Sequence, residues 1–355
     1  MGRRFRSSAQ LAAVLFAYTA GNASAQGFSD AQAFYRDKQL VLLIGYPPGG
    51  GYDTYGRVVA RHMPKYLPPG AHFVVRNIPG AGSLTAANYL FHSSPRDGGE
   101  IAALGREIPT ISLFGETKAR FEPKDLNWIG NAESSPSFCG AWHTSEVEGT
   151  KDLFTRPLIV GATGADSSTA TVPFALNAIL GTRFRVITGY PGGAAMHLAL
   201  ERGEISGRCA WSWSSLSTSG ANWVEEGKVR VLVGLGLERD TRLPNVPTAI
   251  ELTTDTAKKQ ALELVLSQGL LTRPFAGPPN LPGDRLALLR KSFDETMFDA
   301  EFRGEIERQK LEVSPMTGAE MKRIVDKLHL APPEIVRMAA EAMKPPGQPA
   351  APSSR

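Results

Sequence analysis

The sequence predicts an α/β protein with two domains, and three observations lead to this prediction. Apolar, β-prone runs alternate along the chain with segments whose apolar residues repeat at helical spacing, which is typical of largely parallel sheets covered by helices. Turns rich in glycine or hydroxyl side chains follow four of these runs. The 355 residues, 42% of them hydrophobic and 21% charged, are enough for two domains that each bury a core.

The predicted strands are the apolar runs, and the predicted helices are the segments between them in which apolar residues share one face. The strands are expected at 40–44, 73–75, 158–160, 184–187 and 229–235. The helical faces lie at 55–66, 84–91, 172–180, 196–200, 286–297 and 321–328. Proline and glycine at 68–70 end the first of these helices, and Gly181 ends the third.

The first 25 residues are expected to form a secretory signal peptide. They begin with arginines, continue through an apolar run at 11–20 and end in the small-residue site Ala23-Ser24-Ala25. The apolar run is far shorter than the roughly 20 residues that span a bilayer, so we predict cleavage after Ala25 and export of a soluble protein. Residues 344–355 are rich in proline and serine, and a flexible tail is expected there.

The composition argues against nucleic acid, metal and cofactor binding. The formal net charge of +4 includes three arginines of the signal peptide, and the remaining lysines and arginines are scattered along the chain. The six histidines show no HExxH spacing and the sequence has no CxxC pair, so neither a metal nor a cofactor is expected. In an exported chain, Cys139 and Cys209 either form a disulfide or stay as two buried thiols.

The most informative segment is the glycine-rich turn YPPGGGYD at 46–53, between the first predicted strand and the first helix. Its three consecutive glycines let a ligand approach the backbone N–H groups closely, and the N-terminus of the following helix favours negative charge. The turn therefore predicts an anion-binding site. Asp53 is expected to be the N-cap of the helix.

Three further turns of this kind follow predicted strands. The second ends in Ala81-Gly82-Ser83, the third, at 161–169, offers hydroxyl groups, and the fourth, at 188–193, is again rich in glycine. Ligands of open α/β sheets lie at the carboxyl ends of the strands. Because two turns come from each half of the chain, we expect a cleft between two domains. The turns lack the GxGxxG and GK[ST] motifs of nucleotide sites, and no GxSxG nucleophile elbow occurs.

These segments resemble the paired signature of the substrate-binding proteins of tripartite tricarboxylate transporters, the Bug family. The match rests on YPPGGGYD at 46–53, NIPGAG at 77–82, GYPGG at 189–193 and LPNVPT at 243–248, and it covers nearly all of the chain after the signal peptide. The resemblance implies a periplasmic receptor of type II periplasmic binding protein fold, with two α/β domains joined by crossing hinge strands. It further implies that a small organic acid is bound in the cleft and delivered to integral membrane transporter subunits; we expect the receptor to be a monomer.

The family resemblance also suggests where the domains lie. We expect a discontinuous first domain at 26–139 and 265–343, and a second domain at 140–264. The first two turns would then come from the first domain, and the third and fourth turns from the second.

The expected ligand contacts combine the four turns with one arginine. They are Tyr46, Gly49, Gly50, Gly51, Asp53, Ala81, Gly82, Ser83, Ser167, Ser168, Tyr190, Gly192 and Arg208. Arg208 is included because a guanidinium presents two parallel donors to a carboxylate, although a plain surface arginine is an equally good interpretation. Arg106, at another strand end, is a second and weaker candidate cation.

Some residues depart from the family pattern. Pro191 and Ala170 replace a basic residue and a histidine, and the segment 206–213 replaces the usual acidic and apolar strand. The identity of the acid is therefore open. Trp211 and Trp213 alternate as on a strand, so that either one lines the cleft or both pack in the core. A tryptophan in the cleft would favour a larger or aromatic acid.

The predicted activity is capture without chemistry, in which N–H donors, hydroxyl groups and Arg208 hold an anion while two domains close over it. One alternative is an exported hydrolase for an acidic substrate, with Asp53 or Asp166 as the base near His143; no spaced nucleophile–base pair supports it. Another alternative is a sensory adaptor that presents its ligand-bound state to a membrane kinase.

Overall fold

The computed structural model describes residues 30–346 apart from 115–117, 135–136 and 221. The expected signal peptide at 1–25 and most of the tail at 344–355 lie outside these residues. Within the described part of the chain, no helix is long and apolar enough to cross a membrane.

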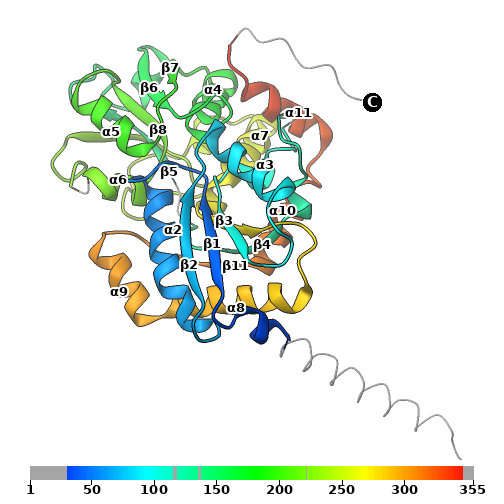
Figure 1. Cartoon of the computed structure of the whole chain (residues 1–355). Helices are drawn as coiled ribbons and strands as arrows, with labels where there is room; N and C mark the ends of the chain where they lie inside the picture. The colour runs from blue at the N-terminus through cyan, green and yellow to red at the C-terminus, as the bar shows by residue number, and fades with distance from the viewer. Residues whose placement is uncertain (1–29, 115–117, 135–136, 221, 347–355) are drawn as a thin grey trace, which may run out of the picture.

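The structure confirms the α/β fold class, with two sheets that are each covered by helices on both faces (Figure 1). The strands are β1 (Gln39–Ile44), β2 (His72–Asn77), β3 (Glu100–Ala103), β4 (Asn127–Asn131), β5 (Ser137–Trp142), β6 (Leu158–Ala162), β7 (Phe184–Thr188), β8 (Gly207–Ser212), β9 (Val229–Gly234), β10 (Pro274–Gly277) and β11 (Met316–Thr317). The α-helices are α2 (Gly51–His62), α3 (Leu84–His92), α4 (Ser168–Leu180), α5 (Gly193–Glu201), α6 (Trp213–Gly220), α7 (Thr256–Leu266), α8 (Gly283–Phe298), α9 (Ala300–Arg308), α10 (Gly318–Leu328) and α11 (Pro333–Ala342). The 3₁₀ helices are η1 (Met63–Tyr66), η2 (Ala81–Ser83), η3 (Ile108–Thr110), η4 (Pro123–Asp125), η5 (Thr150–Phe154), η6 (Ala249–Leu252) and η7 (Ser267–Leu271).

We call the first sheet and the helices packed on it the first lobe. Its strands lie in the order β11-β4-β10-β3-β1-β2. The side chains of β1 alternate between two cores: Leu42 and Ile44 pack with α2, α8 and α9, and Leu43 packs with α3 and α10 on the opposite face. The continuous apolar run that predicted β1 therefore reflects burial on both faces of the sheet.

The second lobe is built in the same way on the strand order β7-β6-β8-β5-β9. Helices α4, α7 and α11 cover one face, and α5 and α6 cover the other. The core under α5 and α6 is aromatic, with Trp142, Trp211 and Trp223 nearly or fully buried. The expectation that a tryptophan lines the cleft is therefore not met by Trp211. Trp213 lies beyond the end of β8, and its indole N–H donates to Asp240 over 2.8 Å.

Each sheet contains a strand, β10 in the first and β5 in the second, that runs against the neighbours on both its sides, and each of these two strands follows a crossing between the lobes; the edge strand β11 is also antiparallel to its neighbour β4. The chain leaves the first lobe at the end of β4 and enters the second lobe as β5, which is antiparallel to β8. It returns through η7 and enters the first lobe as β10, which is antiparallel to β3 and β4. β5 and β10 each start at the end of the sheet where the parallel strands finish. They therefore run in the opposite direction to those strands.

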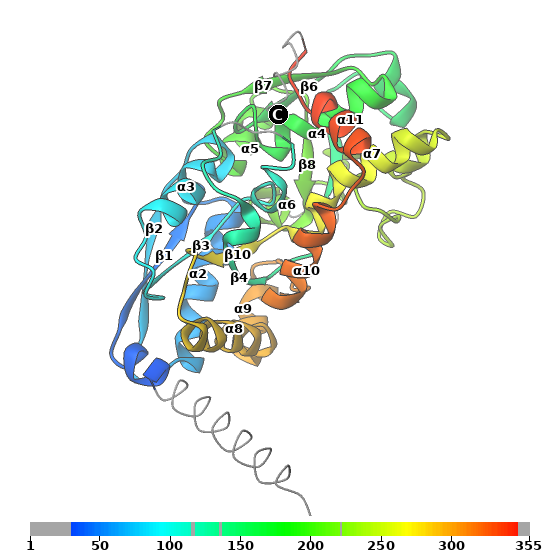
Figure 2. The ribbon, with the colours of Figure 1, turned by 90° about the vertical axis from the view of Figure 1, so that its right-hand side faces the viewer.

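A third crossing lies near the C-terminus. Helix α10 packs on β4 of the first lobe, whereas α11 packs against α4 and α7 of the second (Figure 2). The sequence-based boundary groups residues 265–343 with the first domain, so the position of α11 differs from that expectation. The domain boundaries themselves stay a prediction.

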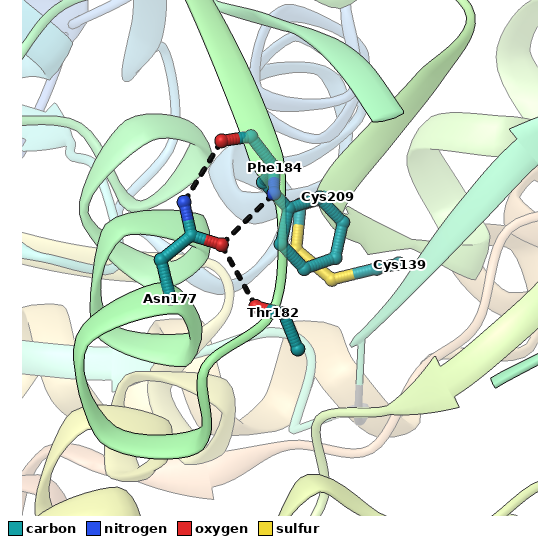
Figure 3. The surroundings of a disulfide bond; sticks show 5 residues. All are labelled: Cys139, Asn177, Thr182, Phe184 and Cys209. Carbon is teal, nitrogen blue, oxygen red and sulfur yellow. Dashed lines mark hydrogen bonds between the residues drawn. A yellow bond between two sulfur atoms is a disulfide. The ribbon is translucent and has the colours of Figure 1, made fainter. Parts of the chain in front are cut away.

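Cys139 and Cys209 form a disulfide that joins β5 to β8 inside the second lobe (Figure 3). Their Cα atoms are 4.0 Å apart, and the pairing register of the two strands shifts at this point. Beside the disulfide, the Asn177 side chain accepts hydrogen bonds from Thr182 and from the N–H of Phe184, and it donates to the carbonyl of Phe184. Of the two alternatives open from the sequence, the disulfide is the one found.

Candidate ligand-binding site

A cavity of about 290 Å³ lies between the two lobes, next to the ends of parallel strands from both sheets. Such a space at an interface between structural units is typical of a small-molecule site. The first lobe contributes Tyr46, Pro47, Pro48, Gly50, Gly51, Tyr52, Arg106 and Arg273 to its wall. The second lobe contributes Thr163, Ser168, Thr169, Pro191, Gly192, Gly193, Ala194, Ala195, Met196, Leu198, Arg208, Ala210, Ser212 and Ser215.

Three helices begin at this cavity: α2 at Gly51 from the first lobe, and α4 at Ser168 and α5 at Gly193 from the second. The residue before each helix has an extended backbone, and none of the three caps its helix with a side-chain hydrogen bond. The N–H groups of a first helical turn have no partner within the helix and attract negative charge. The first helical turns of α2, α4 and α5 together therefore favour an anionic ligand in the cavity.

The predicted turns of the two lobes touch each other beside the cavity. A Cβ atom on Gly192 would lie 3.2 Å from Cγ of Pro47. A Cβ atom on Gly82, whose φ is +62°, would lie only 2.9 Å from Cβ of Ser167. A larger side chain at Gly82 would push the lobes apart, so glycine is needed there for contact between them, whereas at Gly192 a small shift of Pro47 would make room.

The second turn forms this contact between lobes and does not line the cavity. Its residues Ala81, Gly82 and Ser83 all have positive φ, and the Ser83 hydroxyl accepts a hydrogen bond from the N–H of Gly105 over 3.0 Å. The Ser167 hydroxyl likewise donates to a carbonyl of its own loop over 2.8 Å. Ligand contacts by these residues stay predictions.

Two further predicted residues, Gly49 and Tyr190, also lie outside the cavity wall. The N–H of Gly49 donates to Asp53, and the ring of Tyr190 packs against Gly161. In contrast, the predicted residues that line the wall are Tyr46, Gly50, Gly51, Ser168, Gly192 and Arg208.

Asp53 holds the first turn and does not cap α2. Its carboxylate accepts hydrogen bonds from the N–H of Gly49 over 3.0 Å, from Arg57 over 2.9 Å and from Asn77 over 2.8 Å. The helix begins two residues before Asp53, so Gly50 is the N-cap and the predicted cap was wrong. Burial alone would raise the pKa of Asp53, but these hydrogen bonds lower it below its usual value.

Arg208 reaches the cavity from β8 and is 3% exposed. Its Nη1 donates to Nε2 of His197 over 2.6 Å, and its guanidinium lies 4.7 Å from the centre of the Trp211 ring. Burial, together with the charge on Arg208, lowers the pKa of His197 to about 2, so the imidazole is neutral and acts as the acceptor. The interpretation of Arg208 as a surface residue is therefore wrong.

Arg273 lines the cavity from the first lobe and had not been predicted from the sequence. Its Nε lies 3.3 Å from Oε2 of Glu133, and both side chains are almost fully buried. It also donates to the Ser212 hydroxyl over 3.1 Å and stacks 4.4 Å from the centre of the Tyr52 ring. Because Glu133 and Arg273 lie on the first and second crossings between the lobes, their ion pair ties the two crossings together.

Glu107 lies behind the cavity wall, where the Tyr46 hydroxyl donates to its Oε1 over 3.0 Å. Its side chain is buried, and this burial raises the pKa of Glu107 to about 7. In the unfolded chain the carboxyl would have a pKa near 4.5. Between these two values the folded protein holds a proton that the unfolded chain has released.

We therefore expect the free energy of unfolding to fall as the pH rises through this window, by at most on the order of 3 kcal/mol between pH 4.5 and 8. The replacement Glu107→Gln should remove this loss, which urea denaturation at several pH values would measure. Glu122→Gln, at an exposed position, is the control. Parallel pH curves for the wild type and Glu107→Gln would contradict the prediction.

The residues of the alternative interpretation, an exported hydrolase, do not line the cavity. Asp53 is bound by Arg57 and Asn77, and Asp166 lies 3.5 Å from Lys118 of the other lobe. His143 is exposed beyond the end of β5. Asp53, Asp166 and His143 are all outside the cavity wall.

One group of possible metal ligands occurs elsewhere in the first lobe. His62, Asp299 and Glu301 bring their ligand atoms within 4.8 Å of one another. However, Lys65 already lies 2.6 Å from Asp299, and His62 lies 2.7 Å from Glu305. This network of ion pairs accounts for the cluster without a cation.

Several hydroxyl groups of the cavity wall were not predicted. Thr163 and Thr169 lie in the third turn, which the sequence does identify. Ser212 and Ser215 lie at the end of β8 and in the first turn of α6. The same strand-end argument would have found them if it had been applied to the strand-like segment at 206–213.

Comparisons with known proteins agree with this architecture. Residues 56–329 match the family model "Tripartite tricarboxylate transporter family receptor". The "UPF0065 protein in gbd 5'region" of Cupriavidus necator is 27% identical over 346 residues, which are 93% of this chain and 98% of that protein.

Solved structures with the same fold include the periplasmic binding protein BugD, at 19% identity and a TM-score of 0.69, covering 87% of this chain and 98% of that one. R. palustris Rpa4515, solved with adipate, has 19% identity, a TM-score of 0.66 and coverages of 85% and 97%. MatC from Rhodopseudomonas palustris, with bound malate, has 18% identity, a TM-score of 0.64 and coverages of 86% and 99%.

Proposed function

The chain belongs to the family of tripartite tricarboxylate transporter receptors, and from this premise we propose that it captures a small carboxylate ligand in the cavity between its lobes. We further propose that it works in the periplasm, after export through its N-terminal segment, and that it delivers the ligand as a monomer to a membrane transporter. A receptor of this kind binds and releases its ligand unchanged.

The observation that carries this proposal is the convergence of three uncapped helix N-termini on one cavity. Since α2 belongs to the first lobe and α4 and α5 belong to the second, a single anion in the cavity would hold both lobes. A buried carboxylate is unfavourable unless its oxygens accept hydrogen bonds, and first-turn N–H groups supply such bonds. The acids in the solved structures named above, adipate and malate, support a carboxylate as the ligand.

The proposed motion is a hinge between the lobes at the first two crossings. There the N–H of Thr272 donates to the carbonyl of Glu133 over 3.1 Å, and the N–H of Ala132 donates to the carbonyl of Arg273 over 3.0 Å. These bonds hold the crossings side by side. Rotation about them would open the cavity, while the contact of Gly82 with Ser167 would form when it closes.

Mass spectrometry of the compound that co-purifies with the protein tests this function. We expect an organic acid, released only on denaturation, that binds again when added to the stripped protein. At a concentration of about 100 times its Kd it should stabilise the protein by about 2.7 kcal/mol, which thermal unfolding would detect. Conversion of the compound by the purified protein would favour the hydrolase, and failure of every organic acid to bind would rule out the proposed function.

A further inference from the structure

Two arginines of the cavity wall, one from each lobe, have no acidic partner. Arg106 lies between β3 and η3 of the first lobe and is 4% exposed, and Arg208 lies on β8 of the second. Within the described residues, neither guanidinium forms an ion pair with a carboxylate. Arg273, the other arginine of the wall, differs because Glu133 lies beside it.

The two guanidinium groups are near enough to affect each other. Burial, and after it the positive charge of Arg106, lower the pKa of Arg208 to about 9, so that the Arg208 guanidinium still carries its proton at neutral pH. Two buried positive charges without a counter-charge are costly in free energy. Contact between the lobes therefore puts two positive charges on the wall of one small cavity.

The acid closest in sequence to these arginines does not neutralise them. Glu107 follows Arg106 directly, but its carboxyl accepts a hydrogen bond from Tyr46 and faces the contact at Gly82. The charge of Arg106 favours the ionised form of Glu107, but burial outweighs this effect and raises the pKa of Glu107 to about 7, so this side chain is mostly protonated at pH 6. The negative charge has to come from the ligand.

His197, which lines no part of the cavity wall, fixes the direction in which Arg208 points. The imidazole lies 5.4 Å from the ring of Trp211 and 5.3 Å from the ring of Trp223, and it is 2% exposed. Its Nε2 accepts the hydrogen bond from Nη1 of Arg208. In contrast, Nε of Arg208 is buried without a hydrogen-bond partner among the described residues.

We infer that Arg106 and Arg208 form a charge pair divided between the lobes, which selects a ligand carrying two negative charges, and that His197 is the positioning residue for Arg208. This inference rests on the proposed function, since it specifies the ligand of the same cavity. A ligand with one negative charge would leave one of the two arginines uncompensated when the lobes meet. The number of charges, rather than the shape of the carbon chain alone, would then decide which acids are retained.

Calorimetry with matched ligands at pH 6 tests the charge pair. The probes are the linear dicarboxylates from malonate to suberate and the three benzene dicarboxylates, each compared with its monoamide, which has nearly the same shape and one charge fewer. For the tightest dicarboxylate we expect binding at least about 30-fold stronger than that of its monoamide. Equal affinities would overturn the inference while leaving the receptor function intact, whereas binding of no acid would reject both.

Arg106→Gln tests whether the second charge comes from Arg106. We expect this variant to lose most of its affinity for the dicarboxylate and to keep its affinity for the monoamide, so that the ratio falls below about 3-fold. Arg185→Gln, an exposed arginine on β7, is the matched control and should keep the wild-type ratio. An unchanged ratio in Arg106→Gln would remove Arg106 from the pair.

The role of His197 is tested by a pair of replacements. His197→Leu removes the acceptor and should weaken dicarboxylate binding at least about 10-fold, whereas the amide oxygen of His197→Gln can accept from Nη1 and should keep affinity within about 3-fold. Both variants change the aromatic core, and their melting temperatures report that structural effect separately. Equal losses in the two variants would show that His197 only packs and does not position Arg208.

Discussion

Arg208→Ala is expected to weaken binding of the carboxylate ligand at least about 100-fold, because truncating one partner of a buried charge pair costs about 2–5 kcal/mol. Water cannot easily replace this guanidinium, since Arg208 lines the cavity and is only 3% exposed. Calorimetry with the compound that co-purifies with the wild-type protein measures the loss. Of the ligand-binding changes considered for this chain, this one should have the largest effect.

Two controls separate charge from geometry in this experiment. Arg208→Lys keeps the positive charge without the planar pair of donors, so its affinity should fall between those of Arg208→Ala and the wild type. Arg185→Ala changes an exposed arginine and should leave binding unaltered. If Arg208→Ala folds normally and binds as tightly as the wild type, Arg208 is not a ligand contact.

The largest loss of stability is expected for Glu133→Ala. This change removes the carboxylate that faces Arg273, and Glu133 and Arg273 have side chains that are 0% and 2% exposed. Breaking a buried ion pair by removing one partner costs about 3–5 kcal/mol, because the remaining charge stays buried. Denaturation with urea would show the loss as a lower midpoint of unfolding.

A double replacement distinguishes loss of charge balance from loss of packing. Glu133→Leu combined with Arg273→Met removes both charges and keeps much of the buried volume, so it should be more stable than Glu133→Ala alone. Glu226→Ala, which breaks an exposed ion pair with Lys228, should change stability by about 1 kcal/mol or less. A loss for Glu133→Ala no larger than that of Glu226→Ala would contradict this account of the two crossings.

The sequence predicted the strands that are rich in branched apolar residues and missed β5 and β8, which have the same length as β1 and β9, for a physical reason. β1 and β9 consist mainly of branched apolar residues, which mark a strand wherever they run together. β5 and β8, with the sequences SFCGAW and GRCAWS, are buried along their whole length but contain small and polar residues. Their burial comes from the sheet around them, so no local pattern reveals it.

The four turns were predicted as a group, but their individual roles were not. Each one lies at a strand end that faces the other lobe, as the general rule for open α/β sheets requires. Which turn then meets the ligand depends on how the lobes fit together: Gly192 lines the cavity, whereas Gly82 packs against Ser167. Arg273 could not be recognised, because its partner Glu133 lies 140 residues earlier on a separate crossing.

The position of α11 affects the order in which the core of the second lobe can form. Ile335, Ala339 and Ala342 fill the same core as Leu158 and Val160 of β6, which lie 175 to 184 positions earlier in the chain. In the proposed export from the N-terminus, β6 would therefore reach the periplasm long before α11, which completes this core. Until α11 has followed, the core of the second lobe would lack the side chains that this helix contributes.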